Sequence, residues 1–257
     1  MVMPSAARQR SGELVQLPGW TTRQYPLRKF GRAGVQRGLG MLALLAALWV
    51  SASLAWDASR LNAAGQRRGP AGVSAAAALQ ELLNYAGTVD DTIKLATVNV
   101  FFNRRILFRD DIEVWRQQDY WASPLETLWK GQGDCEDYAI AKYFSLLAVG
   151  MPAQRLRLVY VRASLGAPGG PQVAHMVLAY YPAPSGAPDS MTADPWILDN
   201  LIGEIRPASQ RPDLTPVFSF SVDGLWQGTS GSSGGDPLAR LSRWRDVLDK
   251  AREEGLP

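Results

Sequence analysis

The 257-residue sequence contains only one cysteine and one histidine, Cys135 and His175. A single cysteine excludes an intramolecular disulfide, so the chain must be stabilised by a folded hydrophobic core. A structural zinc site is also disfavoured, because two of its four ligands would have to be carboxylates. Any catalysis by a cysteine and a histidine must therefore use Cys135 and His175.

Charge is distributed unevenly along the chain. Residues 1–38 contain seven basic residues and one acidic residue, a net charge of +6, and residues 39–56 contain no charged side chain. Because the whole chain has a net charge of +3, residues 57–257 carry a net charge of −3. The basic character of the chain thus belongs to its N-terminal segment, and we expect no nucleic-acid-binding surface.

The N-terminal segment 1–56 has the pattern of an export signal. A basic region precedes the apolar run 39–56, which ends near the small residues of Ser53-Leu54-Ala55, a pattern typical of a signal-peptidase site. The run also approaches the length of a membrane-spanning helix, so an uncleaved anchor is one alternative. A start codon placed too far upstream is another. Each interpretation predicts a catalytic body outside the cytoplasm, with the leader as its only contact with a membrane.

Cys135 lies at the predicted start of a helix. It belongs to the block 131–138, Gly-Gln-Gly-Asp-Cys-Glu-Asp-Tyr, which is followed by an apolar, helix-forming stretch that ends before Gly150. Asp134 has the N-cap position, which places the thiol in the first turn. The unpaired N–H groups and the positive end of the helix dipole favour a thiolate there, as a nucleophilic cysteine requires.

His175 and Asp199 come from two segments with the pattern of β-strands. His175 lies in the apolar and β-branched run 173–180, and Asp199 follows the short apolar run 196–198. A carboxylate at a strand end beside the histidine strand can accept one imidazole N–H and stabilise the imidazolium. A lone cysteine or histidine is often a core residue. Together, in these settings, they favour a catalytic triad in the order Cys135, His175, Asp199.

The remaining patterns indicate an α+β fold. Helices are predicted at 74–85 and 89–103, before the cysteine helix. An alternating run at 155–161 predicts a strand, which a Gly- and Pro-rich turn at 166–171 connects to the histidine strand. The helices would then pack against an antiparallel sheet.

Glycine-rich stretches mark the expected domain boundaries. Residues 57–72 and 227–235 are predicted to be linkers on either side of a catalytic domain at 73–226. The segment 236–257 is predicted to form one amphipathic helix that packs on this domain, with Asp236 as its N-cap. Within the domain we expect a solvated acidic face or turn at Asp110, Asp111 and Glu113. Four aromatic side chains before the cysteine helix are expected in the core, or alternatively in the wall of a cleft: Trp115, Tyr120, Trp121 and Trp129.

Three blocks of the sequence resemble one family of enzymes. They are Gly-Asp-Cys-Glu-Asp-Tyr-Ala-Ile-Ala-Lys-Tyr at 133–143, Ala-His-Met-Val-Leu at 174–178 and Leu-Asp-Asn at 198–200. Together they resemble the bacterial transglutaminase-like cysteine proteinases of the LapG type, over roughly residues 75–226, and the first block is the most specific. One departure is the segment 181–195, which is longer than the family's usual hairpin and is expected to be a surface loop.

The resemblance implies a transglutaminase- or papain-like fold and a periplasmic protease. Proteases of this type cut a very large surface adhesin near its N-terminus and so release cells from a biofilm, under the control of an inner-membrane receptor for cyclic di-GMP. The resemblance implies that Cys135 is the nucleophile, His175 the general base and acid, and Asp199 the orienting carboxylate. Backbone N–H groups at the helix start would hold the oxyanion, with Gln132 as a candidate side chain.

The resemblance also implies a calcium site at Asp134 and Glu136, with Asp137 as a further candidate. Three carboxylates beside a thiol oppose its ionisation, and a bound Ca²⁺, which takes oxygen ligands, would remove that penalty. The alternative is a capping arrangement, in which Asp134 and Asp137 accept the first-turn N–H groups and Glu136 complements the helix dipole.

Two other functions fit the same residues. An acyltransferase of the transglutaminase type would use the same triad and pass the acyl group to an amine instead of water. A calcium-modulated binding module would hold an adhesin or a receptor without cutting it, although the retention of all three triad residue types argues against a module.

Overall fold

A computed structural model describes residues 56–166, 170–182, 194–228 and 234–257. The predicted export segment lies almost entirely outside the described residues, so the signal peptide and its alternatives remain predictions. Among the described helices, none combines the length and the apolarity that crossing a membrane requires.

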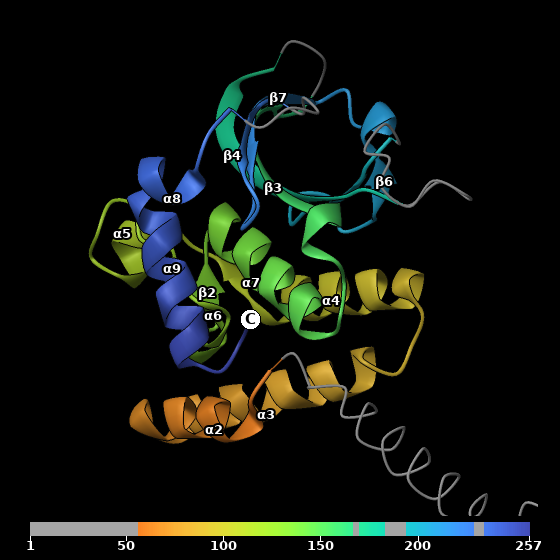
Figure 1. Ribbon diagram of the computed structural model, residues 1–257. Coiled ribbons are helices and arrows are strands. Elements are labelled where there is room, and N and C mark those ends of the chain that lie inside the picture. The colour runs from red at the N-terminus through yellow and green to blue at the C-terminus, as the bar shows by residue number, and fades with distance from the viewer. Residues whose placement is uncertain (1–55, 167–169, 183–193, 229–233) are drawn as a thin grey trace, which may run out of the picture. The chain divides into compact units, whose positions relative to one another are not determined.

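Helices form the first half of the described chain and lie below the sheet in Figure 1. The two helices predicted before the cysteine helix are confirmed; the second begins two residues later than predicted, because Asp90 caps it by accepting the Ile93 N–H at 3.0 Å. The helices that precede the sheet are α2 (Ala58–Arg67), α3 (Gly69–Ala86), α4 (Asp91–Arg105), α5 (Asp111–Val114), α6 (Pro124–Lys130) and α7 (Cys135–Ala148).

The prediction of a linker at 57–72 is wrong, because these residues form α2 and the first turn of α3. Asp57 caps α2 by accepting the N–H groups of Ser59 and Arg60 at 2.9 and 3.1 Å. The glycines have a packing role: a Cβ atom on Gly65 would lie 2.7 Å from the carbonyl oxygen of Gly72. Glycine here lets two helices approach closely, which the sequence pattern alone does not distinguish from flexibility.

The second half of the chain forms a six-stranded antiparallel sheet in the order β6-β5-β4-β3-β7-β8. Helices on one side of such a sheet confirm the predicted α+β class. The small parallel pair β1–β2 leads into α7. The strands are β1 (Leu107–Phe108), β2 (Gln132–Gly133), β3 (Leu156–Ser164), β4 (Gln172–Tyr180), β5 (Trp196–Leu198), β6 (Arg206–Pro207), β7 (Leu214–Phe220) and β8 (Leu225–Gln227), with short 3-10 turns η1 (Ala153–Arg155) and η2 (Ala208–Gln210) between them.

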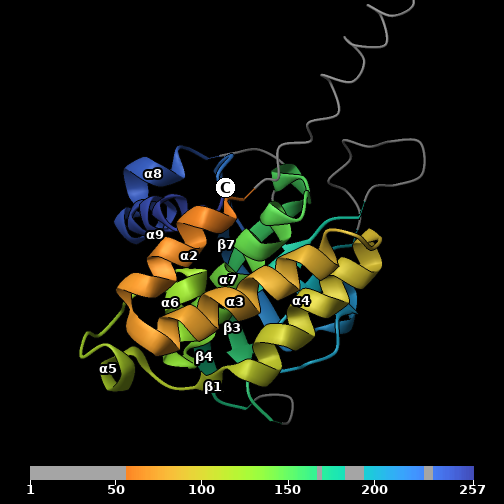
Figure 2. The ribbon, with the colours of Figure 1, turned by 90° about the horizontal axis from the view of Figure 1, so that it is seen from below.

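Helix α7 lies between the sheet and the other helices (Figures 1 and 2). Its side chains from Asp137 to Leu146 are all buried, because β3 and β4 cover one side while α4 and α6 cover the other. A helix enclosed in this way cannot shift without opening the core. Its first turn, which carries Cys135, therefore has a fixed position against β4.

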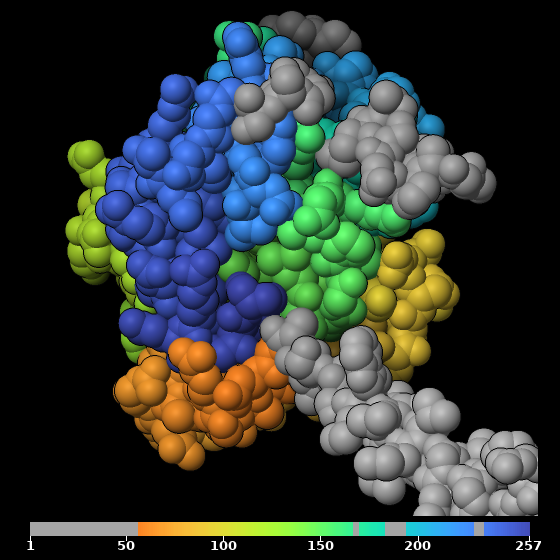
Figure 3. Space-filling model, viewed as in Figure 1, coloured from red at the N-terminus to blue at the C-terminus, as the bar shows by residue number. Residues whose placement is uncertain are grey.

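The C-terminal segment forms two helices, where one was predicted. Helix α8 (Pro237–Arg240) and helix α9 (Ser242–Glu253) are separated at Leu241, whose backbone is not helical (φ −119°, ψ 88°). The predicted apolar stripe of α9 is buried within this domain, and the ring of Trp244 lies 5.2 Å from that of Phe220. The end of the chain runs beside the start of α2, where the Asp57 N–H donates to the Gly255 carbonyl at 2.7 Å (Figure 3).

Three other segments predicted as turns or loops, 166–171, 181–195 and 227–235, fall partly outside the described residues. Residues 183–193 and 229–233 carry no structural description. The predicted surface loop at 181–195 is wrong at its first residue, because Tyr181 is buried; its central part stays a prediction. The second linker, 227–235, is corrected at its ends: Gln227 belongs to β8, and Gly235 pairs with Leu225 in a β-bridge.

Candidate active site

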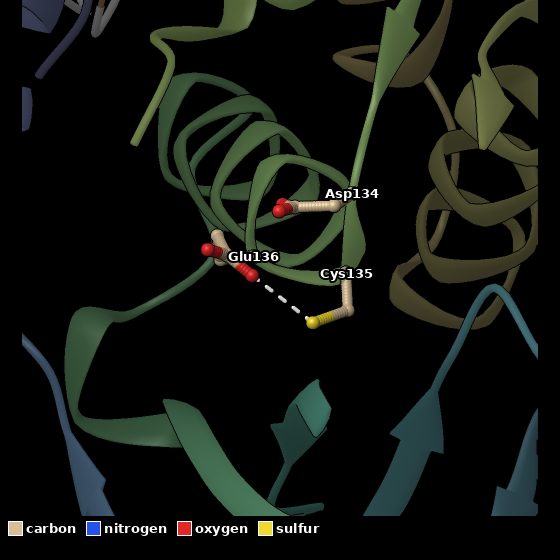
Figure 4. Close-up of side chains that lie close together, drawn as sticks. All are labelled: Asp134, Cys135 and Glu136. Atoms are coloured by element: carbon tan, nitrogen blue, oxygen red, sulfur yellow. Dashed lines mark hydrogen bonds between the residues drawn. The ribbon is translucent and has the colours of Figure 1, made fainter. Parts of the chain in front are cut away.

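Cys135 is the first residue of α7, and only Asp134 separates it from β2 (Figure 4). The chain reaches this position through two glycines that no larger residue could replace without strain. Gly131 ends α6 in the left-handed region, at φ +62°, and a Cβ atom on Gly133 would lie 2.6 Å from Oδ2 of Asp137. The sequence block around the cysteine thus reflects a tight approach of β2 to the first turn of α7.

Asp134 occupies the predicted N-cap position but does not cap the helix. Its backbone is extended, as an N-cap residue requires, yet its side chain accepts no N–H group of α7. Its Oδ1 atom is buried, and no hydrogen-bonding partner for it occurs among the described residues. The capping alternative to a calcium site is therefore wrong for Asp134.

The thiol of Cys135 is held in its protonated form by its surroundings. Burial raises its pKa well above the ordinary range, and the carboxylate of Glu136 raises it further. The thiol donates a hydrogen bond to Oε2 of Glu136 at 3.0 Å, and the two side chains point toward one another (Figure 4). Without a compensating cation, these effects outweigh the stabilisation of a thiolate expected at a helix start.

The backbone N–H of Met176 lies against the Cys135 thiol and lowers its pKa. Because Met176 directly follows His175 in β4, this contact brings the cysteine to the histidine strand. The thiol therefore lies against β4, the strand that contains His175, and the pairing of the two side chains stays a prediction.

His175 and Asp199 form a buried hydrogen-bonded pair. Nε2 of His175 lies 2.8 Å from Oδ1 of Asp199, and the two residues are 3% and 1% exposed. Strand β5 runs antiparallel to β4, with Leu198 opposite Leu178, so the chain beyond Leu198 travels toward His175. This topology explains how a residue 24 positions away meets the imidazole.

Asp199 is ionised in this setting. Burial alone would raise its pKa, but hydrogen bonds from His175, from Arg211 and from the N–H of Leu201 lower it to about 2. A carboxylate accepts hydrogen bonds and cannot donate. In its neutral form the imidazole therefore carries its proton on Nε2 and leaves Nδ1 unprotonated.

Two asparagines of α4, which the sequence analysis did not single out, hold the segment after β5. Nδ2 of Asn103 donates to the Asp199 carbonyl, and Nδ2 of Asn99 donates to the Gly203 carbonyl, each at 2.8 Å. The two residues are four apart and so share one face of the helix. A polar pair at this spacing, among apolar neighbours, is the sequence signal that could have indicated the contact.

A cluster of acidic side chains surrounds the start of α7. Oxygen atoms of Asp111, Asp134 and Asp137 lie within 4.8 Å of one another, and a second such group joins Asp111 to Asp119 and Glu136. Asp111 is only 2% exposed, so the prediction of a solvated acidic turn is wrong for this residue. Its carboxylate accepts the backbone N–H of Tyr120, which comes from the loop before α6.

The cluster has the chemistry of a site for a hard cation. Burial, followed by the neighbouring carboxylates, raises the pKa of Asp134 to about 10, and burial raises the pKa of Asp111 to about 6. Burial also raises the pKa of Asp137. Each of the three has a buried oxygen for which the described residues supply no hydrogen-bond donor. Several convergent carboxylate oxygens without donors are the ligand set that Ca²⁺ prefers.

The four aromatic residues expected in the core form a partly buried wall beside this cluster. Trp121 stacks on Phe220 with ring centroids 5.6 Å apart, and Trp115 packs on Tyr120 at 4.4 Å. Trp121 and Trp129 pack against the hydrophobic core. Each of the four side chains is thus partly buried, as predicted for the core, and partly exposed to solvent, which the core prediction did not include.

Comparisons with known proteins agree with this architecture. The family model for bacterial transglutaminase-like cysteine proteinases matches residues 75–212. Calcium-bound and EGTA-treated structures of Legionella pneumophila LapG are each 34% identical to this chain, with TM-scores of 0.61; they cover 76% of it, and the matches span 98% and 97% of those chains. A search of curated proteins gave no match. The chain is therefore a cysteine peptidase that belongs to the family of bacterial transglutaminase-like cysteine proteinases.

Proposed function

We propose that the protein is a periplasmic, Ca²⁺-dependent cysteine endopeptidase that uses Cys135, His175 and Asp199. The observation that carries the proposal is the contact of the Cys135 thiol with the backbone of Met176, next to a histidine bonded to a buried carboxylate. This arrangement supplies a nucleophile, a base and an orienting group in the order that acyl transfer requires.

Because the proton of neutral His175 lies on Nε2, its Nδ1 atom is the base in the first step of the reaction. Nδ1 takes the proton of the Cys135 thiol, and the resulting thiolate attacks the carbonyl carbon of the scissile bond. Backbone N–H groups at the start of α7 stabilise the oxyanion, with Gln132 of β2 as the candidate side chain. The imidazolium then protonates the leaving amine, and His175 next accepts a proton from the water that hydrolyses the acyl-enzyme.

Ca²⁺ is the cofactor that the acidic cluster fits. The residues that would hold it are Asp134, Glu136 and Asp137, as predicted from the sequence, together with Asp111, which the fold adds. A bound cation would compensate the carboxylates that raise the thiol pKa and would so favour the thiolate. The related LapG of Legionella pneumophila has been solved both calcium-bound and EGTA-treated, which supports the assignment of the ion.

The substrate, the partner and the compartment follow from the family resemblance and the leader. A basic region followed by an apolar run supports export to the periplasm. A large surface adhesin, cut near its N-terminus, is the proposed substrate, and the periplasmic domain of a cyclic-di-GMP receptor is the proposed controlling partner. A pull-down of this chain by that receptor domain tests the partner, and the absence of retention would remove it from the proposal.

Product analysis separates hydrolysis from the two alternatives. The wild-type chain and Cys135→Ala are incubated with the N-terminal region of the host's largest adhesin and a primary amine, with Ca²⁺, and the products are identified by mass spectrometry. We expect two fragments, from the wild type alone: one ends in a free carboxylate at the cut and the other begins with a free amine. A product joined to the amine would establish an acyltransferase. Binding without cleavage under every condition would establish a binding module.

A further inference from the structure

Arg211 is one of the largest fully buried side chains among the described residues, at 2% exposed. It follows η2 and precedes β7, and it lies far from both sequence blocks that contain the cysteine and the histidine. Its aliphatic surroundings include Val161, Val177 and Ile197, with which it lines a cavity of about 130 Å³. A charged group in such a place is costly unless it is paired; Nε and Nη2 of Arg211 are paired, whereas the described residues supply no partner for Nη1.

The partners of Arg211 are two carboxylates. Its Nη2 atom donates to Oδ2 of Asp199 at 2.7 Å and to Oδ2 of Asp213 at 2.8 Å, and its Nε atom donates to Oδ1 of Asp213 at 3.0 Å. The Asp199 and Arg211 side chains are 0% and 1% exposed, whereas that of Asp213 is 30% exposed. The guanidinium therefore links the innermost acid of the site to an acid at the surface.

The two oxygens of Asp199 have separate partners. Oδ1 accepts from His175 Nε2 and from the Leu201 N–H at 3.0 Å, while Oδ2 accepts from Arg211. A carboxylate bound on one oxygen alone can rotate about its terminal torsion, which is soft. With both oxygens bound, the plane of the group is fixed, and with it the direction in which Oδ1 meets the imidazole.

We propose that Arg211 is a positioning residue, which orients Asp199 so that His175 keeps its proton on Nε2 and presents Nδ1 to Cys135. The inference rests on the proposed triad. A role in filling space alone would not require a guanidinium, because an apolar side chain of similar volume would suit the neighbouring aliphatic residues. The charge and the N–H donor are what the buried Asp199 carboxylate uses.

The experiment uses the single histidine of the chain, whose two ring nitrogens give the only imidazole signals in a ¹⁵N NMR spectrum. The full chain, loaded with Ca²⁺, is compared with Arg211→Met, Arg211→Lys and the control Arg206→Met. Arg206 is a surface arginine of the same segment that pairs with Glu204 and does not contact Asp199. Adhesin cleavage and the melting temperature are measured on the same samples.

We expect a pure Nε2–H tautomer in the wild type and in Arg206→Met, and a mixed population in Arg211→Met. The kcat for cleavage should fall in Arg211→Met on the order of 10- to 100-fold with KM unchanged, as for loss of the outer partner of an oriented imidazole. Arg211→Lys, which keeps the charge and one hydrogen bond, should recover part of the Nε2–H tautomer population and part of the kcat. It also keeps the test open if Arg211→Met fails to fold.

An unchanged tautomer and an unchanged kcat in folded Arg211 variants would overturn the inference. A lower melting temperature with normal kcat would also overturn it, because it would show a structural role alone. Failure of the proposed function gives a different result: the wild type would not cleave the adhesin, while the tautomer would still depend on Arg211.

Discussion

The Nε2 atom of His175 lies 2.8 Å from Oδ1 of Asp199, and both side chains are buried between β4 and the segment that follows β5. Because Asp199 is ionised, this contact determines which imidazole nitrogen would act as the base in the proposed mechanism. The Cys135 thiol meets the same strand at Met176. The catalytic proposal thus depends on one strand that contacts both the nucleophile and the orienting acid.

Replacing Asp199 by asparagine should disable the site more than the small change in shape suggests. The three groups that bind the Asp199 oxygens are all donors, from His175, Leu201 and Arg211. An amide offers only one acceptor oxygen, so one donor must lose its partner or the imidazole must adopt the other tautomer. We expect kcat to fall roughly 10²- to 10⁴-fold. Normal kcat in Asp199→Asn, measured beside the exposed control Asp249→Asn, would contradict the proposed role.

Calcium should stabilise the folded chain through the acidic cluster. A ligand at about 100 times its Kd adds about 2.7 kcal/mol to the free energy of unfolding, so the melting temperature should be higher with Ca²⁺ than with EGTA. Asp111→Asn should reduce this difference, whereas Glu113→Gln, an exposed acid two residues away, should not. Equal calcium responses in the two variants would exclude Asp111 as a ligand.

The stability of the protein should depend on pH through Glu254, which is 1% exposed. Burial raises its pKa to about 7 from the ordinary value of 4.5, although Ser123 and Arg68 bind its Oε1 atom. Between these pH values the folded state binds more protons than the unfolded state. The stability that protonated Glu254 contributes is therefore complete below about pH 4.5 and is lost as the pH rises to about 7. The free energy of unfolding changes by on the order of 3 kcal/mol over this range.

Glu254→Gln removes this titration. The melting temperature of the variant relative to the wild type should thus increase from about pH 5 to about pH 8. The neighbouring exposed residue provides the control Glu253→Gln, for which the difference should not change with pH. A constant difference for Glu254→Gln would show that Glu254 does not titrate in this range.

Substitution of Gly65 by alanine should destabilise the protein, against the ordinary preference of helices for alanine over glycine. A new Cβ atom would lie 2.7 Å from the Gly72 carbonyl oxygen and 2.8 Å from the Ala76 Cβ, which forces α2 and α3 apart. Overpacking of this kind costs roughly 1–3 kcal/mol, more than the ~1 kcal/mol that helix propensity returns. Denaturant unfolding measures the change, with Ala63→Ser on the exposed face of α2 as the control. A stabilised Gly65→Ala would show that α2 is not packed on α3 in solution.

Much of the site could be predicted because the sequence offers few choices. One cysteine at a helix start, one histidine in a strand and one acid at a strand end are local patterns, and each lies in the predicted element. Arg211 and Asp111 could not be found in this way. Their importance arises from tertiary contacts with Asp199 and with the start of α7, and their own sequence neighbourhoods resemble ordinary turns.

The errors in the fold prediction have the same origin. The glycines at 65 and 72 indicate flexibility when only local sequence is considered, yet they serve close packing between two helices. The stripe of α9 is predicted correctly, because its helical periodicity is local. The break at Leu241, between α8 and α9, is not predicted by that periodicity.

The dependence of adhesin cleavage on free Ca²⁺ tests the central claim most directly. The wild-type chain and Cys135→Ala are compared over a range of free Ca²⁺ set with EGTA, and the initial rate of cleavage is measured. The account predicts a rate that rises to saturation with Ca²⁺ for the wild type, falls to zero in excess EGTA, and is absent at every concentration for Cys135→Ala. Full cleavage in excess EGTA, or any cleavage by Cys135→Ala, would contradict it.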